Sequence, residues 1–314
     1  MRNYRHLSWE ERKVLGVLLE RGESLRSIAR TLERSHSSLC REIRRNRPLK
    51  NYHPLRAEWI ADKRLRQSHR RPRLKNAVLR RRVESWLLKR WSPEIIAGRL
   101  ARLKGRKLIS PEAIYQWVYA EAPHLIRSLP RHRPVRGARR MDRSKSLIPG
   151  RVSVYNRPPE ANLRLESGHW EVDLVIGKGK SALQVAVERK TRTTRLAKIP
   201  DKTAIASYHA LCRIFSSVPQ HLRRSVTYDN GFENALHQLL NARFNMRSFF
   251  CLPSHCWEKP TVENTNGLIR WFLPKRSNFD MISDQRILEI ENWLNSRPRK
   301  CLQFLTPLEA ITHL

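Results

Sequence analysis

The feature that most constrains the fold is a series of three β-rich runs that begins abruptly after residue 168. Residues 170–176, 182–188 and 194–199 are rich in β-branched and other apolar side chains, and short turns separate them, the first containing Gly177 and Gly179. Runs joined by turns this short predict three antiparallel strands of one sheet. The second half of the chain is therefore expected to be an α/β domain.

The segments that follow extend this pattern. Helical periodicity covers residues 203–215 and 235–242, strand-like runs cover 225–228 and 246–252, and Thr261 can cap a further helix. A last helix contains Ile287, Ile290 and Leu294. The order βββαβαβα is similar to the ribonuclease H-like arrangement, a mixed sheet flanked by helices. We expect this domain to occupy residues 163–314.

Three acidic residues stand at informative places in these elements. Asp173 lies within the first strand, Asp229 follows the strand 225–228, and Glu263 lies in the first turn of a helix. Asp229 precedes Asn-Gly, so an Asx turn is the favoured explanation when this residue is taken alone. Three carboxylates brought together repel each other unless a cation lies between them, and hard divalent ions prefer oxygen ligands. Two Mg²⁺ ions about 4 Å apart can promote an in-line phosphoryl displacement. Glu171 shares a side with Asp173 and is a weaker ligand candidate.

The net charge predicts a polyanionic partner. Lys and Arg number 63 against 28 Asp and Glu, which gives a formal charge of +35. Double-stranded DNA is the obvious candidate. No apolar run of roughly 18 residues is present, so no membrane partner is expected, and a cytoplasmic, nucleoid-associated protein is predicted. The five cysteines are scattered and odd in number, which favours reduced thiols.

The first fifty residues predict a helix-turn-helix domain. Ser8 with Glu11 fits a capping box, Ser24 can cap a second helix, and a third helix runs from about residue 36 to 45. Leu39 and Ile43 would face inward. The residues expected to contact DNA from the exposed side are His36, Ser37, Ser38, Arg41, Arg44 and Arg45, with Glu42 exposed beside them. An ordinary three-helix bundle with a solvated basic face is the alternative.

The middle of the chain predicts two linkers around a second helical domain. Residues 51–73 contain a helical stretch followed by a tract so basic that we expect a linker along a phosphate backbone. Residues 74–126 predict three helices, and two of them start with Ser-Pro-Glu, at Ser92 and Ser110. This segment is expected to be a second helix-turn-helix, with a plain helical connector as the alternative. Residues 127–162 are Arg-rich and are expected to form an extended linker.

Several motifs together resemble insertion-sequence transposases of the IS-thirty family. They include HWEVDLVIG at 169–177, VERKTR at 187–192, TYDNG at 227–231, VENTNGLIR at 262–270 and FLPK at 272–275. LSWEER at 7–12, WSPE at 91–94 and NSRPRK at 295–300 also resemble that family, so coverage is essentially the whole chain. The resemblance implies a DDE recombinase with Asp173, Asp229 and Glu263 as metal-binding acids and a core similar to retroviral integrases. It also implies recognition of the element's terminal inverted repeats.

The sequence WEKP at 257–260 departs from that family, which usually has glycine where Pro260 stands. If that glycine adopts a positive φ, the loop before Glu263 must be rebuilt, so a catalytically decayed copy is an alternative. Lys259 and Arg270 are expected to contact DNA. Mn²⁺ is a possible substitute for Mg²⁺, and the two ends of an element suggest at least a dimer on DNA. A basic helical half joined to an α/β half would also suit a non-enzymatic DNA-binding regulator or a ribonuclease H-like nuclease.

Overall fold

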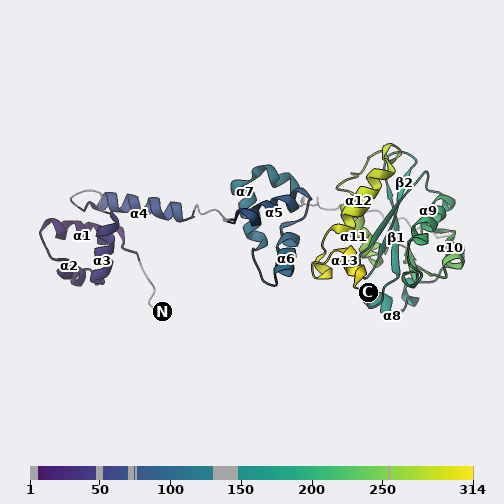
Figure 1. Ribbon diagram of the computed structural model, residues 1–314, viewed down its shortest axis with the longest axis horizontal. Helices are drawn as coiled ribbons and strands as arrows, with labels where there is room; N and C mark the ends of the chain where they lie inside the picture. The colour runs from purple at the N-terminus through teal and green to yellow at the C-terminus, as the bar shows by residue number, and fades with distance from the viewer. Residues whose placement is uncertain are drawn as a thin grey trace. The chain divides into compact units, whose positions relative to one another are not determined.

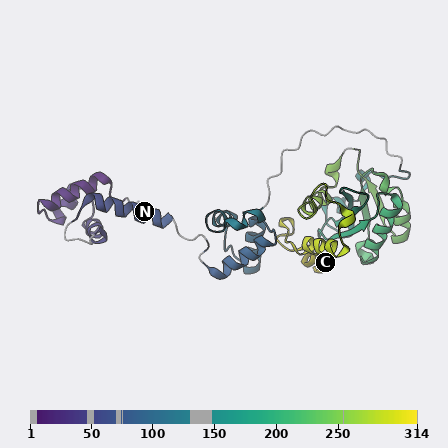
Figure 2. The ribbon, with the colours of Figure 1, turned by 90° about the horizontal axis from the view of Figure 1, so that it is seen from above.

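The computed structural model describes residues 6–46, 52–69, 74, 76–129, 148–253 and 255–313. The chain divides into two compact units, Met1–Lys75 and Asn76–Leu314. Figures 1 and 2 give two views of their elements. No helix among the described residues is both long and apolar enough to cross a membrane.

The first unit is helical, as predicted. Its elements are α1 (Trp9–Glu20), α2 (Leu25–Thr31), α3 (His36–Asn46) and α4 (Pro54–His69). The capping box of Ser8 with Glu11 and the N-cap of Ser24 are confirmed. Leu15, Ile28 and Leu39 are fully buried and form the centre of this small core.

Helix α4 corrects the prediction of a linker from residue 51. Residues 63–69 of the basic tract continue the helix, because Arg, Lys, Leu and Gln are good helix formers. Arg12 is 5% exposed and forms ion pairs with Glu42, at 2.7 Å, and with Glu58 of α4. This cluster joins α1, α3 and α4, so Glu42 is not exposed as expected. Residues 70–73 of the predicted linker lie outside the described residues.

The second unit begins with three helices. These are α5 (Ala77–Leu88), α6 (Pro93–Lys104) and α7 (Pro111–Glu121), followed by the short helix η1 (Pro123–Ser128). Ser92 and Ser110 cap α6 and α7, with proline in the first turn of each helix. The three predicted helices are therefore confirmed, while DNA binding by this segment stays a prediction.

These helices pack against the C-terminal part of the chain, so they are not a separate domain as expected. Arg99 of α6 forms an ion pair with Glu309, and the Trp293 indole N–H donates to the carbonyl oxygen of Lys89 at 2.8 Å. The ring of Phe304 lies over Gly98 so closely that no Cβ could be added there unless the ring moved. Sequence patterns within each segment carry no information on this long-range contact.

A five-stranded mixed sheet forms the centre of the second unit. The strands are β1 (His169–Ile176), β2 (Ala182–Glu188), β3 (Thr194–Ile199), β4 (Ser225–Tyr228) and β5 (Arg247–Phe250). Their spatial order is β3-β2-β1-β4-β5, with β1 antiparallel to β2, β2 antiparallel to β3, and β4 parallel to both β1 and β5. The ribonuclease H-like fold is confirmed.

Helices cover both faces of the sheet (Figures 1 and 2). One face packs against α9 (Ala204–Ser216) and α10 (His237–Phe244) through Trp170, Val172 and Val226. The opposite face packs against α11 (Pro260–Ile269) and α12 (Asp284–Ser296) through Val175, Val185 and Val187. The last helix is α13 (Pro307–Thr312). The period-two alternation of the strands thus sets which side chains face α11.

The end of the predicted Arg-rich linker belongs to this packed unit. Ile148 is buried in the core, and η2 (Val154–Asn156) and α8 (Pro159–Leu163) follow it. Arg157 is 8% exposed and donates to the hydroxyl oxygen of Thr227 at 3.0 Å. The linker prediction is therefore wrong for residues 148–162, because apolar side chains and a buried arginine attach them to the sheet. Residues 130–147 lie outside the described residues.

Candidate active site

The register between β1 and β4 places two of the predicted acids side by side. These parallel neighbours pair Glu171 with Thr227. Two residues further along, on the same face, come Asp173 and Asp229. Neighbouring strands of a sheet lie about 4.8 Å apart. The sheet itself therefore brings the two aspartates together at the carboxyl end of β4.

A buried ammonium group lies between the two aspartates. The Nζ atom of Lys259 is 3.3 Å from Oδ1 of Asp173 and 3.4 Å from Oδ2 of Asp229. It also donates a hydrogen bond to the carbonyl oxygen of Val172 at 2.9 Å. Only 3% of Lys259 is exposed. The sequence predicts a DNA contact for this residue, whereas in the structure its charge faces two carboxylates.

These charged groups shift one another's pKa values. Burial raises the pKa of Asp173, the ammonium of Lys259 opposes the rise, and the charge of Asp229 adds to it. Burial also acts against the charge of Lys259, but the carboxylates of Asp229 and Asp173 more than offset it and raise the pKa of the lysine. Lys259 is therefore protonated at neutral pH and supplies one positive charge to the two acids.

The turn after β4 holds the carboxylate of Asp229. Its Oδ1 atom accepts hydrogen bonds from the backbone N–H of Gly231 at 3.4 Å and from the side-chain amide of Asn234 at 2.8 Å. The Asn230 amide donates to the carbonyl oxygen of Cys251 at 2.8 Å. The Asx-turn interpretation is confirmed for one carboxylate oxygen, while the other oxygen faces the ammonium group.

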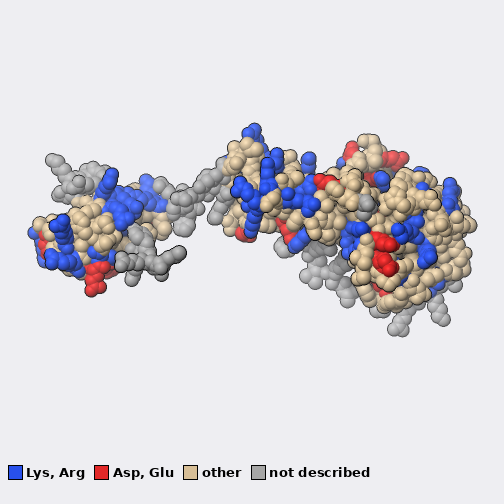
Figure 3. Space-filling model, turned by 60° about the horizontal axis from the view of Figure 1, so that its bottom comes forward, with Lys and Arg blue, Asp and Glu red and all other residues tan. Residues whose placement is uncertain are grey.

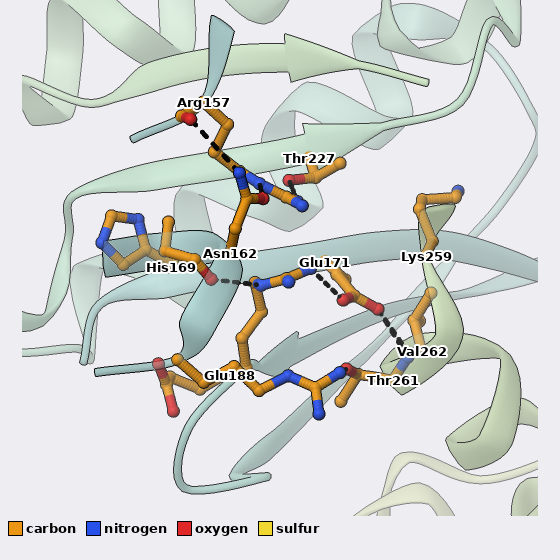
Figure 4. Close-up of polar contacts among 12 residues, drawn as sticks. Arg157, Asn162, His169, Glu171, Glu188, Thr227, Lys259, Thr261 and Val262 are labelled. Atoms are coloured by element: carbon orange, nitrogen blue, oxygen red, sulfur yellow. Dashed lines mark hydrogen bonds and ion pairs between the residues drawn. The ribbon is translucent and has the colours of Figure 1, made fainter. Parts of the chain in front are cut away.

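Helix α11 lies along β1 and carries the third predicted acid. At its start, the backbone N–H groups of Thr261 and Val262 donate to Oε2 of Glu171 at 2.8 and 2.9 Å (Figure 4). Further along the helix, the side-chain amide of Asn266 donates to Oδ2 of Asp173 at 2.6 Å. These contacts fix which face of α11 is turned towards the aspartates.

Glu263 precedes Asn266 by three residues, so both side chains lie on the same face of α11. The Glu263 side chain is exposed and has no hydrogen bond or ion pair within the described part of the chain. Among the described residues, no three His, Cys, Asp or Glu side chains are close enough to hold one metal ion. The structure thus brings together two of the three acids and leaves Glu263 on the neighbouring helix.

Glu171 has a structural contact for each of its carboxylate oxygens. Its side chain is fully buried, and Oε1 forms an ion pair with the Arg189 guanidinium at 2.5 Å. Oε2 accepts the two N–H groups at the start of α11. Both oxygens thus contact groups of the protein itself, and through Oε2 Glu171 positions the helix that carries Glu263.

Pro260 is the first residue of α11. A proline ring suits the first helical position, because the N–H that it lacks has no partner within the helix. The next two N–H groups donate to Glu171, so the start of the helix is satisfied. The prediction that Thr261 caps this helix is wrong. Pro260 itself has a helical conformation, which its ring favours, and Lys259 before it has a negative φ of −118°.

Glu233 is an acid near the site that sequence patterns did not single out. It lies in the short helix η4 (Phe232–Asn234), and its carboxylate lies so close to Gly231 that a Cβ at that glycine would collide with it. Burial raises the pKa of Glu233, and the charges of Asp229 and Asp173 add to the rise. Its position four residues after Asp229, across a predicted turn, is the signal that could have found it.

The predicted DNA-contacting face of α3 is turned to solvent. Leu39 is buried and Ile43 is half-buried, as expected for the inward face. The exposed residues on the other side are His36, Ser37, Arg41, Arg44 and Arg45, with Ser38 half-buried. Their contact with DNA stays a prediction.

Arg270 fastens the end of α11 to β1. Its guanidinium donates to the carbonyl oxygens of Ile176 at 2.7 Å and Leu273 at 3.5 Å. Burial lowers the pKa of this arginine. These two carbonyl groups already use part of the hydrogen-bonding capacity of the guanidinium. A contact between Arg270 and DNA stays a prediction.

The donor atoms of the site fit a hard divalent cation. Asp173 and Asp229 offer carboxylate oxygens, which Mg²⁺ prefers, and they already share one cationic group. On the face drawn in Figure 3, a small group of acidic side chains lies on the sheet-containing unit with Lys and Arg side chains beside it. The Lys and Arg side chains beside this acidic group suit a polyanionic substrate.

Comparisons with known proteins identify the family of the chain. A helix-turn-helix domain model matches residues 3–46. The transposase for insertion sequence element IS1086 of Cupriavidus metallidurans is 37% identical, covering 99% of this chain and 95% of the relative. Transposase InsI for insertion sequence element IS30A of Escherichia coli is 35% identical over 98% of this chain and 83% of its own length.

The crystal structure of the catalytic core domain of BIV integrase is 18% identical, with a TM-score of 0.35, and the match covers 47% of this chain and 95% of that one. The transposase for IS4351 of Bacteroides fragilis is 35% identical over 99% of this chain and 96% of its own length. Full-length similarity at this level shows common descent. The chain therefore belongs to the IS-thirty family of insertion-sequence transposases.

Proposed function

We propose that the protein is a DDE transposase. It binds the terminal inverted repeats of its insertion sequence, cleaves DNA at the element ends and joins the freed 3′ ends to target DNA. The family supports transposition as the biological role. The two-step phosphoryl transfer and the residues that carry it are the proposal.

The observation that carries the proposal is the pair of aspartates around one cation. Asp173 and Asp229 come from neighbouring parallel strands, and each lies within 3.4 Å of the same ammonium nitrogen. Asn266 contacts Asp173 from α11, and Glu263 lies three residues before Asn266, on the same face of that helix. Convergent acids that are held against a cation are the expected ligands for metal-dependent phosphoryl transfer.

The chain's residues would hold and orient the reacting groups. Asp173, Asp229 and Glu263 would bind Mg²⁺, or Mn²⁺ as a substitute, and such ions activate an attacking hydroxyl and stabilise the leaving oxygen. Glu171 fixes the start of α11, and Asn234 orients the Asp229 carboxylate. Water attacks in the first step and the freed 3′-hydroxyl in the second, so no covalent enzyme intermediate is required.

DNA binding would begin in the first unit. The basic exposed face of α3 supplies groups that reach base edges and phosphates, and the formal charge of +35 favours attraction to the duplex. Because an element has two ends, we infer that at least a dimer assembles on DNA. The DNA substrate would keep the protein at the nucleoid.

The decisive experiment replaces Asp229 by Asn. Strand transfer between an element-end duplex and a plasmid target should disappear in Mg²⁺, while binding to the end duplex stays within about twofold of wild type. The matched control is Asp201→Asn, which removes the same charge from the turn before α9. That control should retain both binding and joining. Undiminished joining by Asp229→Asn contradicts the three-acid mechanism.

The same assay separates a transposase from the competing functions. A DNA-binding regulator would bind the ends but give no joined product even with the wild-type chain, as would a decayed copy. A ribonuclease H-like nuclease would cleave without joining and would not require the terminal repeats.

A further inference from the structure

A cavity of about 230 Å³ lies beside the first turn of α11. It is distinct from the aspartate pair, because its walls come from the other side of this helix, including Thr261 and Asn264. At roughly 30 Å³ per water molecule, the volume accommodates a small polyatomic anion with several waters.

Three arginines from distant parts of the sequence line this cavity. Arg164 follows α8, Arg192 lies in the turn between β2 and β3, and Arg299 follows α12. Arg164 and Arg192 both donate to the hydroxyl oxygen of Thr261, at 3.3 and 2.7 Å. Three cationic groups are thereby brought to the start of the helix that carries the third acid.

These arginines have no carboxylate partner among the described residues. The buried carboxylate of Glu171 pairs with Arg189 instead. Burial lowers the pKa of Arg164, and the charges of Arg192 and Arg189 add to that effect. Burial likewise lowers the pKa of Arg299 to about 10. Arg299 is buried and the other two arginines are half-buried. Like charges that are partly removed from water without a counterion destabilise a fold, so an anion at this point would offset an existing cost.

The guanidinium groups also have unused hydrogen-bonding capacity. Arg299 is 8% exposed, and its Nη2 donates to the carbonyl oxygen of Leu294 at 3.2 Å. The Nε atoms of Arg164, Arg192 and Arg299 are buried without any hydrogen-bond partner. Buried donors are normally paired, so three unpaired Nε atoms beside one cavity are unusual.

Local backbone geometry gives no reason for two of these arginines. Arg164 has a φ of 59° and Arg192 a φ of 65°. The left-handed region disfavours a side chain by roughly 1–2 kcal/mol, and glycine or asparagine would fit there more easily. The backbone conformation does not require arginine at these two positions, so we attribute the arginines to what their side chains contact.

We propose that this cavity binds a backbone phosphate of the DNA strand that enters the active site. A phosphodiester offers two anionic oxygens, and guanidinium groups bind such oxygens in pairs. The first turn of α11 would then contact phosphate through one face and present Glu263 to the aspartates through the other. This inference rests on the proposed function, since it requires a DNA strand at the site.

The test is a phosphate-neutralisation scan with the full-length chain. Its probes are duplexes from an inverted repeat of the element, each with one phosphate near the cleavage position replaced by a neutral methylphosphonate. In Ca²⁺, one neutral position should weaken wild-type binding about tenfold, the loss expected for one charge-assisted contact. That position should have little further effect on Arg192→Gln, which already lacks the contact.

Arg164→Gln provides a second variant with the same expected coupling. The matched control is Arg247→Gln at the exposed start of β5, which removes the same charge away from the cavity. This control should keep the wild-type response to the neutral position. If every neutral position weakens wild type, Arg192→Gln and Arg164→Gln by equal factors, the cavity does not bind DNA phosphate.

A second arm distinguishes DNA from a small phosphate. Inorganic phosphate is titrated while the melting temperature is followed for wild type and Arg192→Gln. A phosphate-dependent rise in wild type alone, without coupling in the scan, would assign the cavity to a free phosphate compound and overturn the proposal. Strand transfer by Asp229→Asn is scored separately, so failure of the cavity and failure of the three-acid mechanism give different results.

Discussion

The ammonium nitrogen of Lys259 lies 3.3 Å from Oδ1 of Asp173. This contact gives the two acids an internal cation, because the same nitrogen also reaches Asp229. One positive charge of the protein therefore partly balances the two carboxylates. In so basic a chain, Lys259 is expected to contact DNA, whereas in the structure it pairs with two acids of the same chain.

Replacing Lys259 by Met should destabilise the metal-free protein by about 2 kcal/mol, because two half-buried carboxylates lose their common charged partner. Mg²⁺ should then raise the melting temperature of Lys259→Met more than that of wild type, since no ammonium group competes for the aspartates. Lys180→Met, at an exposed lysine, is the control and should stay within about 0.5 kcal/mol of wild type. If Mg²⁺ raised the melting temperatures of Lys259→Met and wild type by the same amount, Mg²⁺ and the ammonium group would not compete for the aspartates.

Glu171→Gln keeps the shape of the side chain but removes its charge. The buried Arg189 guanidinium then lacks a counterion and the start of α11 loses a charged acceptor, so the free energy of unfolding should fall by about 3 kcal/mol. Urea denaturation measures this. Glu289→Gln breaks the exposed pair with Arg286 and should change stability by less than about 1 kcal/mol. Similar losses for both variants would contradict the assignment of Glu171 as the support of α11.

His169 should give the protein an acid-dependent loss of stability. Burial, with the charge of Arg224, lowers the pKa of His169 from 6.5 to about 4. Between these values the unfolded chain binds more protons than the folded one, so stability falls as pH decreases from 6.5 towards 4. His169→Gln can still contact Ser225 and should lose this part of the slope in urea denaturation. The exposed His209→Gln control should retain it, and an unchanged slope in His169→Gln would refute the assignment.

Pro260→Gly introduces the residue that is usual for the family. Because Pro260 already fits the first position of α11, the change should lower stability by up to about 1 kcal/mol through a more flexible unfolded chain. Strand transfer should not rise. A marked gain of strand transfer in Pro260→Gly would mean that the proline does impair the active site.

Arg44→Gln tests the exposed face of α3. If this arginine contacts a phosphate, the slope of log affinity against log salt for the end duplex should become less steep by about 0.9. Arg26→Gln, on the exposed side of α2, is the matched control and should leave the slope unchanged. Equal changes in the two variants would mean that α3 makes no special phosphate contact.

Most of the local structure could be predicted from the sequence. The strands 182–188, 194–199 and 225–228 and the caps at Ser8, Ser92 and Ser110 are as predicted, because alternation and capping depend on residues close in the chain. Boundaries were less accurate where the signal was weak. Helix α10 begins at residue 237 and not at 235, and α4 continues through a tract expected to be a linker.

The sequence by itself determined the order of strands and helices and the positions of Asp173, Asp229 and Glu263 within them. The tertiary structure decided what surrounds these acids. The register of β1 against β4 joins the aspartates, and the docking of α11 brings in Lys259 and buries Glu171. These contacts join residues far apart in the chain, and hydrophobic periodicity within one element does not encode which distant charges meet. Burial makes these ion pairs and hydrogen bonds strong, because a charge removed from water is costly unless it is paired.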